Sequence, residues 1–275
     1  MKVIDIKSLE WEGYETLENK AKKGQFHNKL VVISNDLARQ NTRITLEEEK
    51  LLHCVFSQLN PHGKNNTKIM IKKDELFEKL GLTGGDRYVE TKKKLKGLMH
   101  KSMVDVTIGE TDIFGYVITH VISHHRSEWF EVILNEAFMP YVQELASHYT
   151  KLQLDSIVQF DSRYSLILYK YLASWAGEHP ERMLMVNTKQ LKEMFGLSKD
   201  DYVYNDKFNR ALFEKKTLDT AIDEINEKVP GFDVVYKKSK KGNRVQGYII
   251  HWIDRNRIAY GDGVVPGQTT IEDFL

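Results

Sequence analysis

A nine-residue unit occurs twice in this chain, at positions 74–82 and 189–197. The first copy reads DELFEKLGL and the second reads KQLKEMFGL, with an offset of 115 positions between them. In both copies, apolar and charged residues at helical spacing lead to Gly-Leu, which is typical of a short amphipathic helix that ends at a glycine. Because one chain of 275 residues carries this unit twice, we expect two domains built on one plan.

The composition excludes several classes of protein. The single cysteine, Cys54, cannot form an internal disulfide or a cysteine-rich zinc site, and a lone thiol fits a reducing compartment. No apolar run approaches the roughly 20 residues of a membrane span. The first residues, MKVIDIKSLEWEGYE, are mixed and acidic, unlike a signal peptide. We therefore expect a soluble, cytoplasmic protein.

Charged residues are segregated along the chain, although the net charge is only +1. Residues 86–101 hold six Lys or Arg against two acids, and residues 236–244 hold five with no acid. Residues 128–161 instead carry six acids against one lysine. Clustered cations displace the counterions of a polyanion, so this segregation favours a nucleic-acid-binding face. The alternative is that each cluster is an ordinary solvated surface.

The segment around the first copy predicts three helices with a short strand between the first two. ITLEEEKLLHCVFSQLN forms the first helix, with Thr45 and Glu48 as a capping box, and KIMI forms the strand. The repeated unit is the second helix and ends at Gly81. After the turn TGGD, a longer helix begins at Arg87 and buries Val89, Leu95, Leu98 and Met99. MVDVTIG, GYVITHVIS and WFEVIL then predict strands of one small sheet.

The segment around the second copy repeats this order. SIVQFDSRYSLILYKYLASWAG is helical, MLMVN supplies the strand, and the repeated unit follows, capped by Asn187 or Thr188. A longer helix is expected over residues 205–228, before Pro230-Gly231. FDVVYKK and RVQGYIIHW then predict two strands, joined by the basic loop SKKGN.

This order of elements is that of a winged helix-turn-helix domain. In such domains the third helix enters the DNA major groove, and the hairpin, or wing, lies along the backbone or minor groove. We therefore expect an α+β protein of two tandem winged-helix domains, at residues 29–145 and 146–254. Residues 1–28 would form an acidic N-terminal arm, and residues 255–275 a flexible C-terminal tail.

The chain resembles the RepB-type initiators of iteron-containing plasmids over about residues 28–253. The resemblance rests on RYSLILYKYLASW at 163–175, FEKKTLDTAIDEIN at 213–226 and VVYKKSKKGNRVQGYIIHW at 234–252. It implies a protein that binds direct repeats, or iterons, at a replication origin, helps to open AT-rich DNA, and recruits the host's initiator and helicase.

The same resemblance implies a homodimer in equilibrium with the monomer. Dimers of such proteins bind an inverted repeat at their own promoter and repress it, which contributes to plasmid copy control. Proteins with this fold also act as phage replication initiators or as transcriptional repressors, and both alternatives stay open.

Position matching with this family places polar residues of both third helices and of the second wing on the DNA. Asn and Arg can contact base edges with two hydrogen bonds, whereas lysines mainly contact phosphate, so we expect the second domain to read the sequence. The alternative for Asn209 and Arg210 is an ordinary exposed helix surface. The predicted DNA-binding residues are Arg87, Lys92, Lys93, Lys94 and Lys96 in the first domain, and Tyr204, Asn205, Lys207, Asn209, Arg210, Lys237, Lys238, Lys240, Lys241, Asn243 and Arg244 in the second.

An enzyme is the main competing class, and its sequence signatures are absent. The chain has no GxxxxGK[ST] phosphate-binding loop. The histidines of HVISHH, at 120–125, lack the spacing with which rolling-circle nickases hold a metal. On an alternating strand His120 and His124 share one face while His125 points away. We expect no catalytic residue, metal or cofactor.

The last eight residues, QTTIEDFL, resemble the peptide with which replication proteins bind a sliding clamp. Such a peptide anchors apolar side chains in a hydrophobic groove. Leu275 departs from the final aromatic residue of that pattern, and the tail also departs from the shorter bacterial form. The alternative is a merely acidic terminus. The predicted clamp-binding residues are Gln268, Ile271, Phe274 and Leu275.

Overall fold

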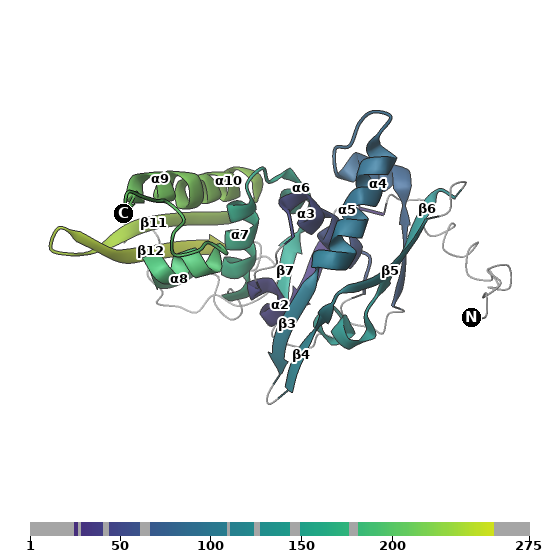
Figure 1. Ribbon diagram of the computed structural model, residues 1–275, viewed down its shortest axis with the longest axis horizontal. Coiled ribbons are helices and arrows are strands. Elements are labelled where there is room, and N and C mark those ends of the chain that lie inside the picture. The colour runs from purple at the N-terminus through teal and green to yellow at the C-terminus, as the bar shows by residue number, and fades with distance from the viewer. Residues whose placement is uncertain are drawn as a thin grey trace.

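The computed structural model describes residues 25–26, 29–40, 44–60, 67–108, 111–123, 127–143, 149–175 and 181–255. These residues form two lobes side by side along the long axis of the molecule, and a long hairpin projects from one end (Figure 1). Most of the predicted N-terminal arm, and the predicted tail beyond Arg255, lie outside the described residues. No helix among the residues that the structure describes is long and apolar enough to cross a membrane.

The first lobe contains the predicted order of helix, strand, helix and helix. The capping box of Thr45 and Glu48 is present at the start of the first of these helices. In chain order the lobe contains β1 (Leu30–Ser34), α2 (Asn35–Arg39), α3 (Leu46–Phe56), β2 (Lys68–Lys72), α4 (Lys73–Lys79), α5 (Arg87–Lys101), β3 (Met103–Ile108), β4 (Thr111–Tyr116), β5 (Ile118–Ser123), β6 (Trp129–Leu134), the 3-10 helix η3 (Glu136–Tyr141) and β7 (Tyr149–Gln153).

The strands of the first lobe form separate sheets, so the prediction of one small sheet is wrong. β3 pairs only with β4 among the described strands, whereas β2, β6 and β5 form a three-stranded sheet in that order. Val117 separates β4 from β5. Its N–H donates to the carbonyl of Ser102 at 3.1 Å, and its carbonyl accepts from the N–H of Asn135 at 2.8 Å. These bonds turn the segment predicted as one strand, GYVITHVIS, from one sheet into the next.

The inner face of α5 differs from its prediction at one position. Thr91, Leu95 and Leu98 are buried, but Val89 is 63% exposed. Tyr88 packs inward in its place, with its ring stacked on Phe130 at 5.9 Å between centroids. Residues 88, 91, 95 and 98 follow the 3.6-residue period of a helix, and position 89 falls outside that stripe.

The second lobe repeats the architecture with a larger wing. Its main sheet has the order β11-β12-β8, with both pairs antiparallel. In chain order the lobe contains α6 (Leu154–Gln159), α7 (Arg163–Trp175), β8 (Glu181–Asn187), α8 (Thr188–Met194), β9 (Val203–Tyr204), β10 (Lys207–Phe208), α9 (Arg210–Glu214), the π-helix η4 (Lys215–Asp219), α10 (Thr220–Lys228), β11 (Phe232–Lys241) and β12 (Arg244–Asp254).

The two copies of the repeated unit end in the same way. Gly81 has φ 64° and Gly196 has φ 66°, a left-handed conformation that favours glycine. In each copy the following leucine donates its N–H to a carbonyl five residues earlier, Leu82 to Phe77 and Leu197 to Lys192, both at 2.8 Å. This pattern is the Schellman cap of a helix C-terminus. The repeat in sequence is therefore a repeat in structure.

The long helix of the second lobe begins at Arg210 and not at residue 205 as predicted. Asn205 and Asp206 have φ 48° and 58°, and they turn the chain between β9 and β10. Asn and Asp tolerate this left-handed conformation, which a helix does not contain. The side chain of Asn209 then caps the helix by accepting from the N–H of Leu212 at 3.1 Å.

A π-turn, η4, lies in the middle of this helix. Buried residues recur every four positions, at Phe213, Thr217, Ala221 and Ile225. In a regular α-helix, a four-residue repeat drifts by about 40° around the axis with each step. The wider π-turn at 215–219 corrects this drift, so that both halves of the helix face the same core.

The predicted boundary at residues 145 and 146 falls between two strands of one sheet, because β1 pairs with β7 along its whole length. The two lobes meet through an ion pair and a cation–π contact. The buried side chains of Glu49 on α3 and Lys170 on α7 form an ion pair. The guanidinium of Arg39 lies 3.7 Å over the ring of Trp175.

The end of the predicted N-terminal arm is packed on the first lobe. Phe26 is 4% exposed. The side chain of Gln25 donates to the carbonyl of Met70 at 3.1 Å and accepts from the N–H of Lys72 at 2.7 Å. These residues therefore belong to the first lobe, because they complete the edge of β2.

Candidate nucleic-acid interface

The wing of the second lobe is the hairpin of β11 and β12, which pair from Phe232 and Asp254 to Lys241 and Arg244. Gly242, at the tip, has φ 59°. Toward the tip Ser239 pairs with Gly247 but Lys240 pairs with Val245, so Gln246 is the extra residue of a β-bulge. On the tip side of this bulge, the predicted residues Lys240, Lys241, Asn243 and Arg244 are exposed.

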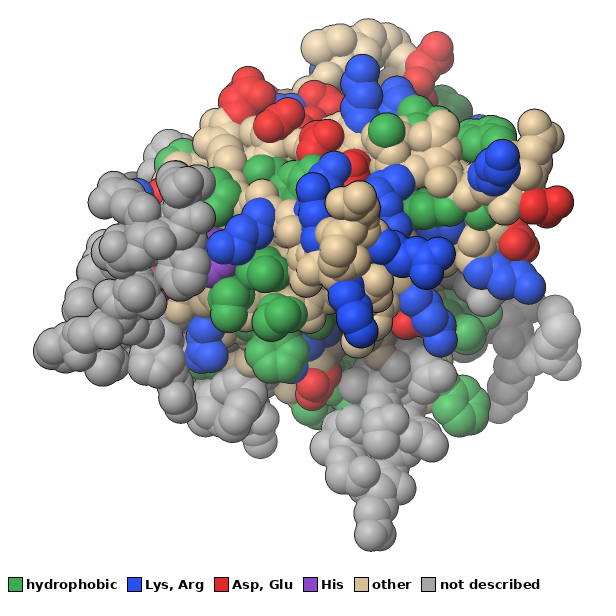
Figure 2. All heavy atoms as spheres, turned by 90° about the vertical axis from the view of Figure 1, so that its left-hand side faces the viewer, with side chains coloured by type: hydrophobic (Ala, Val, Ile, Leu, Met, Phe, Trp, Pro, Cys, Tyr) green, Lys and Arg blue, Asp and Glu red, His purple; other side chains and the backbone are tan. Residues whose placement is uncertain are grey.

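The end of the molecule that carries the wing is rich in cations. Figure 2 shows this end, with Lys and Arg side chains gathered across the centre of the face and acidic side chains mostly toward its upper edge. The second lobe also exposes lysines that are not among the predicted DNA-binding residues. Two of them form the Lys-Lys pair of FEKKTLD, at the start of η4. These exposed lysines are Lys189, Lys199, Lys215 and Lys216.

Arg210 does not present its guanidinium to solvent as a sequence reader would. Its Nη1 donates to Thr188 Oγ1 at 3.2 Å and to the hydroxyl of Tyr248 at 3.0 Å, and its Nη2 donates to the carbonyl of Val245 at 3.5 Å. These hydrogen bonds hold α9 against α8 and β12, and the DNA contact of Arg210 stays a prediction. Asn209 is exposed, but its side-chain oxygen is used by the helix cap.

Three more of the predicted residues, Tyr204, Asn205 and Lys207, lie on the small hairpin of β9 and β10. Tyr204 is 57% exposed, and Asn205 and Lys207 are exposed beside it. They were expected at the start of a helix, and the left-handed turn of Asn205 and Asp206 places them on a protruding loop instead. The structure thus brings them to the lobe surface near the helix N-terminus.

Glu214 lies at the centre of a polar network beneath the wing. Its Oε2 accepts from Lys238 Nζ at 2.6 Å, and its Oε1 accepts from the hydroxyl of Tyr248 at 3.0 Å. Burial raises the pKa of Tyr248 to about 12, although the hydrogen bond from Arg210 acts in the opposite direction. Tyr248 is therefore protonated and donates at neutral pH. Of the predicted wing cations, Lys238 faces the helix and is partly committed to the fold.

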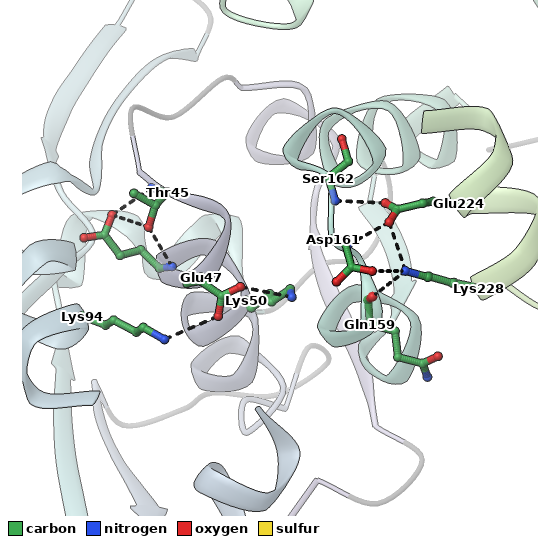
Figure 3. Close-up of polar contacts among 10 residues, drawn as sticks. Thr45, Glu47, Lys50, Lys94, Gln159, Asp161, Ser162, Glu224 and Lys228 are labelled. Atoms are coloured by element: carbon green, nitrogen blue, oxygen red, sulfur yellow. Dashed lines mark hydrogen bonds and ion pairs between the residues drawn. The ribbon is translucent and has the colours of Figure 1, made fainter. Parts of the chain in front are cut away.

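The far end of the long helix is fastened to the start of α7. Lys228 donates to the carboxylates of Asp161 at 2.7 Å and of Glu224 at 3.0 Å (Figure 3). Glu224 in turn accepts from the N–H groups of Asp161 and Ser162. The hydrogen bond from Lys228 lowers the pKa of Asp161. These contacts fix the direction of the helix relative to α7.

In the first lobe, the lysines of α5 divide into two groups. Lys92, Lys93 and Lys96 are exposed, whereas Lys94 contacts Glu47 of α3 at 3.5 Å (Figure 3). Arg87 contacts Asp74 at 3.4 Å and lies 5.2 Å over the ring of Phe77. Exposed cations on the third helix are what phosphate contact requires, so three of the five predicted residues present free surface on one helix.

The histidines of 120–125 and the predicted clamp-binding peptide are the two remaining features of the sequence. His120 is exposed, while His124 and His125 lie outside the described residues, as do Gln268, Ile271, Phe274 and Leu275. Within the part of the chain that the structure describes, no group of three or more His, Cys, Asp or Glu side chains could hold a metal ion.

Comparison with known proteins identifies two family models. The model described as Initiator Replication protein, WH1, matches residues 30–173, and the model described as Initiator Rep protein, WH2, matches residues 187–252. The first model runs through α7, further than the predicted end of the first domain. The comparison with curated proteins finds no match to this chain. The prediction of an α+β protein with two tandem winged-helix domains is confirmed.

The fold is similar to that of a solved initiator structure. The crystal structure of Pi initiator protein in complex with iteron DNA matches with a TM-score of 0.68 and 14% identity, over 82% of this chain and 98% of that chain. A structure of domains 2 and 3 of RctB matches with a TM-score of 0.46 and 9% identity, over 76% of this chain and 82% of that chain.

Proposed function

The chain belongs to the initiator replication protein family, and from that premise we propose that it starts plasmid replication by binding direct repeats at the origin. The family resemblance predicted from sequence is confirmed by the two winged-helix models. A protein of the same fold, the Pi initiator, is known in complex with iteron DNA, which supports the same ligand class here. The protein acts without catalysis of its own.

The main observation that supports this proposal is the positive charge of the wing. A hairpin tip with exposed Lys240, Lys241 and Arg244 and no acidic residue in 236–244 is unfavourable unless a polyanion compensates its charge. It lies beside the N-terminal end of the third helix, as in winged-helix domains that place these elements on the major groove and on the backbone. Exposed Lys92, Lys93 and Lys96 supply the matching contacts from the first lobe.

The finer steps follow from the family resemblance and, for the clamp, from the resemblance of the terminal peptide. On the origin the protein opens adjacent AT-rich DNA and recruits the host's initiator and helicase in the cytoplasm. As a dimer it binds an inverted repeat at its own promoter and limits its synthesis. The terminal peptide, residues 268–275, binds a sliding clamp, and deletion of these residues should weaken clamp pull-down while DNA affinity stays the same.

The test is a footprint and binding titration on the DNA that flanks the gene, for the wild type and for Lys240→Gln with Lys241→Gln and Arg244→Gln. Two recognition helices on one face of B-DNA should protect roughly 20 base pairs per monomer, in tandem repeats. The triple variant should lose this protection. The pair Asn209 and Arg210 is a poorer choice for the test, because both side chains hold the fold.

The possible outcomes separate the functional classes. Protection of tandem repeats beside AT-rich DNA supports initiation, whereas protection of a lone palindrome assigns the protein as a transcriptional repressor. A protected region of about 10 base pairs per monomer would mean that one domain reads the DNA. No protection above that of a random-sequence duplex would overturn the proposal.

A further inference from the structure

Three polar links join β11, the first strand of the wing, to the helix that runs beneath it. Asn226 makes two hydrogen bonds to the backbone of Val234, at 2.7 and 2.8 Å. The hydroxyl of Tyr236 donates to Asp219 at 2.7 Å, and Lys238 donates to Glu214 at 2.6 Å. Residues 234, 236 and 238 alternate along β11, so their side chains share the face that covers the helix. Each link lies closer to the wing tip than the one before.

The link nearest the tip differs from the other two because its acceptor, the carboxylate of Glu214, is buried. Glu214 has a side chain 6% exposed, and it contacts Lys238 and Tyr248, which oppose each other across the hairpin. A buried carboxylate is costly unless it is paired and hydrogen-bonded. Here an ammonium group and a hydroxyl supply that compensation, so the carboxylate holds one strand of the wing through Lys238 and the other through Tyr248.

Arg210 holds the same part of the wing one helical turn earlier. Its Nη2 donates to the carbonyl of Val245, which lies directly beside the bulge at Gln246. Since residues four apart lie on one face of a helix, Arg210 and Glu214 contact the hairpin together. Of the exposed cations of the tip, Lys240 lies opposite this point of attachment, and Lys241 and Arg244 lie beyond it. A bulge re-aims the strand that follows it, and here its base is fixed to the helix.

We propose that Glu214 is a positioning residue for DNA binding, which holds the wing at a fixed angle to the third helix through Lys238 and Tyr248. The inference rests on the proposed function, because it specifies how that same surface meets DNA. Helix and wing then contact the duplex as one rigid unit, and the tip cations reach phosphate without an ordering cost at binding.

Replacement of Glu214 by Gln provides a test, because a pure charge effect and a positioning role predict opposite changes in DNA affinity. Glu214→Gln removes a negative charge near the DNA, so counting charges alone predicts tighter binding. A positioning role predicts weaker binding, by about tenfold. It also predicts a shallower salt dependence of the binding constant, by about 0.9 in slope for each phosphate contact that the tip loses. The substitution removes no cation, so any loss of slope must come through the geometry of the wing.

The matched control is Asp223→Asn, which removes a carboxylate from an exposed position on α10. We expect binding equal to or slightly tighter than wild type for this control. Lys238→Met should weaken binding more than Lys240→Met does, and adding Glu214→Gln to Lys238→Met should cost nothing further. Thermal unfolding of each variant shows that the protein measured is folded. If Glu214→Gln does not fold, the comparison of Lys238→Met with Lys240→Met decides.

The probes are duplexes from the DNA flanking the gene and a random-sequence duplex at low salt. Wild type that binds the flanking DNA no better than the random duplex would refute the proposed function, while the order of Glu214→Gln and Asp223→Asn on the random duplex still tests the positioning role. If Glu214→Gln binds as tightly as Asp223→Asn, or if Lys238→Met and Lys240→Met behave alike, the positioning role is overturned.

Discussion

The hydroxyl of Tyr248 lies between Arg210 and Glu214, accepting a hydrogen bond from the first and donating one to the second, each at 3.0 Å. Tyr248 is 1% exposed. It therefore connects two residues of the third helix through a side chain of the wing. This arrangement explains why Arg210, which looks like a base reader in the sequence, points into the protein.

Tyr248→Phe should lower the free energy of unfolding by about 1–3 kcal/mol, because it removes one partner each from a buried carboxylate and a guanidinium. Urea denaturation of both proteins measures this difference. As a control, Tyr204→Phe on the exposed β9 should stay within about 0.5 kcal/mol of wild type. Equal losses for the two variants would show that the network contributes nothing to stability.

Neutralising the wing tip should change the salt dependence of DNA binding more than it changes stability. Each of Lys240→Gln, Lys241→Gln and Arg244→Gln should reduce the slope of log K against log salt by about 0.9, if each cation contacts one phosphate. Titrations at several salt concentrations measure this slope. Lys68→Gln, on β2 of the first lobe, is the control and should leave it unchanged. A slope that stays constant for all three tip variants would place the DNA elsewhere.

The parts of the fold with strong local signals were predictable from sequence. The capping box of Thr45 and Glu48, the left-handed glycines at 81 and 196 and the Asn187 cap depend on residues within one helical turn. The same short-range signals made the two copies of the repeated unit recognisable, and the order of helices and strands was predicted around these copies.

Features that depend on distant contacts were not predictable in this way. The direction of Arg210 depends on Tyr248, 38 positions later. The turn into the helix depends on two residues with positive φ, which the strong helical pattern of 205–228 concealed. Within the wing, the sequence shows five cations but not that Lys238 faces Glu214, because strand register and the bulge decide the face of each side chain.

Gly247→Ala should destabilise the second lobe. A Cβ at this position would lie 2.4 Å from the carbonyl oxygen of Val186 on β8, so either β8 or β12 must move. Overpacking of this kind typically costs about 1–3 kcal/mol. Gly85→Ala is the control, because a Cβ there meets no atom within 4 Å. Thermal unfolding of the two variants side by side tests the expectation, and similar melting temperatures would contradict it.

The buried His53 should make stability depend on pH. Burial and the nearby Lys170 ammonium lower the pKa of His53 to about 4. Because the unfolded pKa is near 6.5, the unfolded chain binds more protons than the folded chain between these values, so the free energy of unfolding falls as the pH decreases. The loss should be about 2 kcal/mol between about pH 7 and about pH 5.

Urea denaturation of wild type and of His53→Gln at the two pH values measures this contribution. Gln cannot take up the proton, so the variant should lose less stability on acidification, even if it is less stable at neutral pH. Parallel losses in the two proteins would mean that His53 is protonated in the folded state at the lower pH.

The ion pair of Glu49 and Lys170 should hold the two lobes together at a cost that appears only when one partner is removed. Both side chains are 5% exposed. Lys170→Met leaves a buried carboxylate without its ammonium partner and should cost about 3–5 kcal/mol, whereas replacing both residues by apolar side chains of similar size is often close to neutral. Lys170→Met combined with Glu49→Leu should therefore recover most of the loss. The free energies of unfolding of the two single variants and the double variant measure the coupling. A double variant as unstable as the sum of the single ones would show that each charge is stabilised independently of the other, and that the junction is held by other contacts, among them that of Arg39 with Trp175.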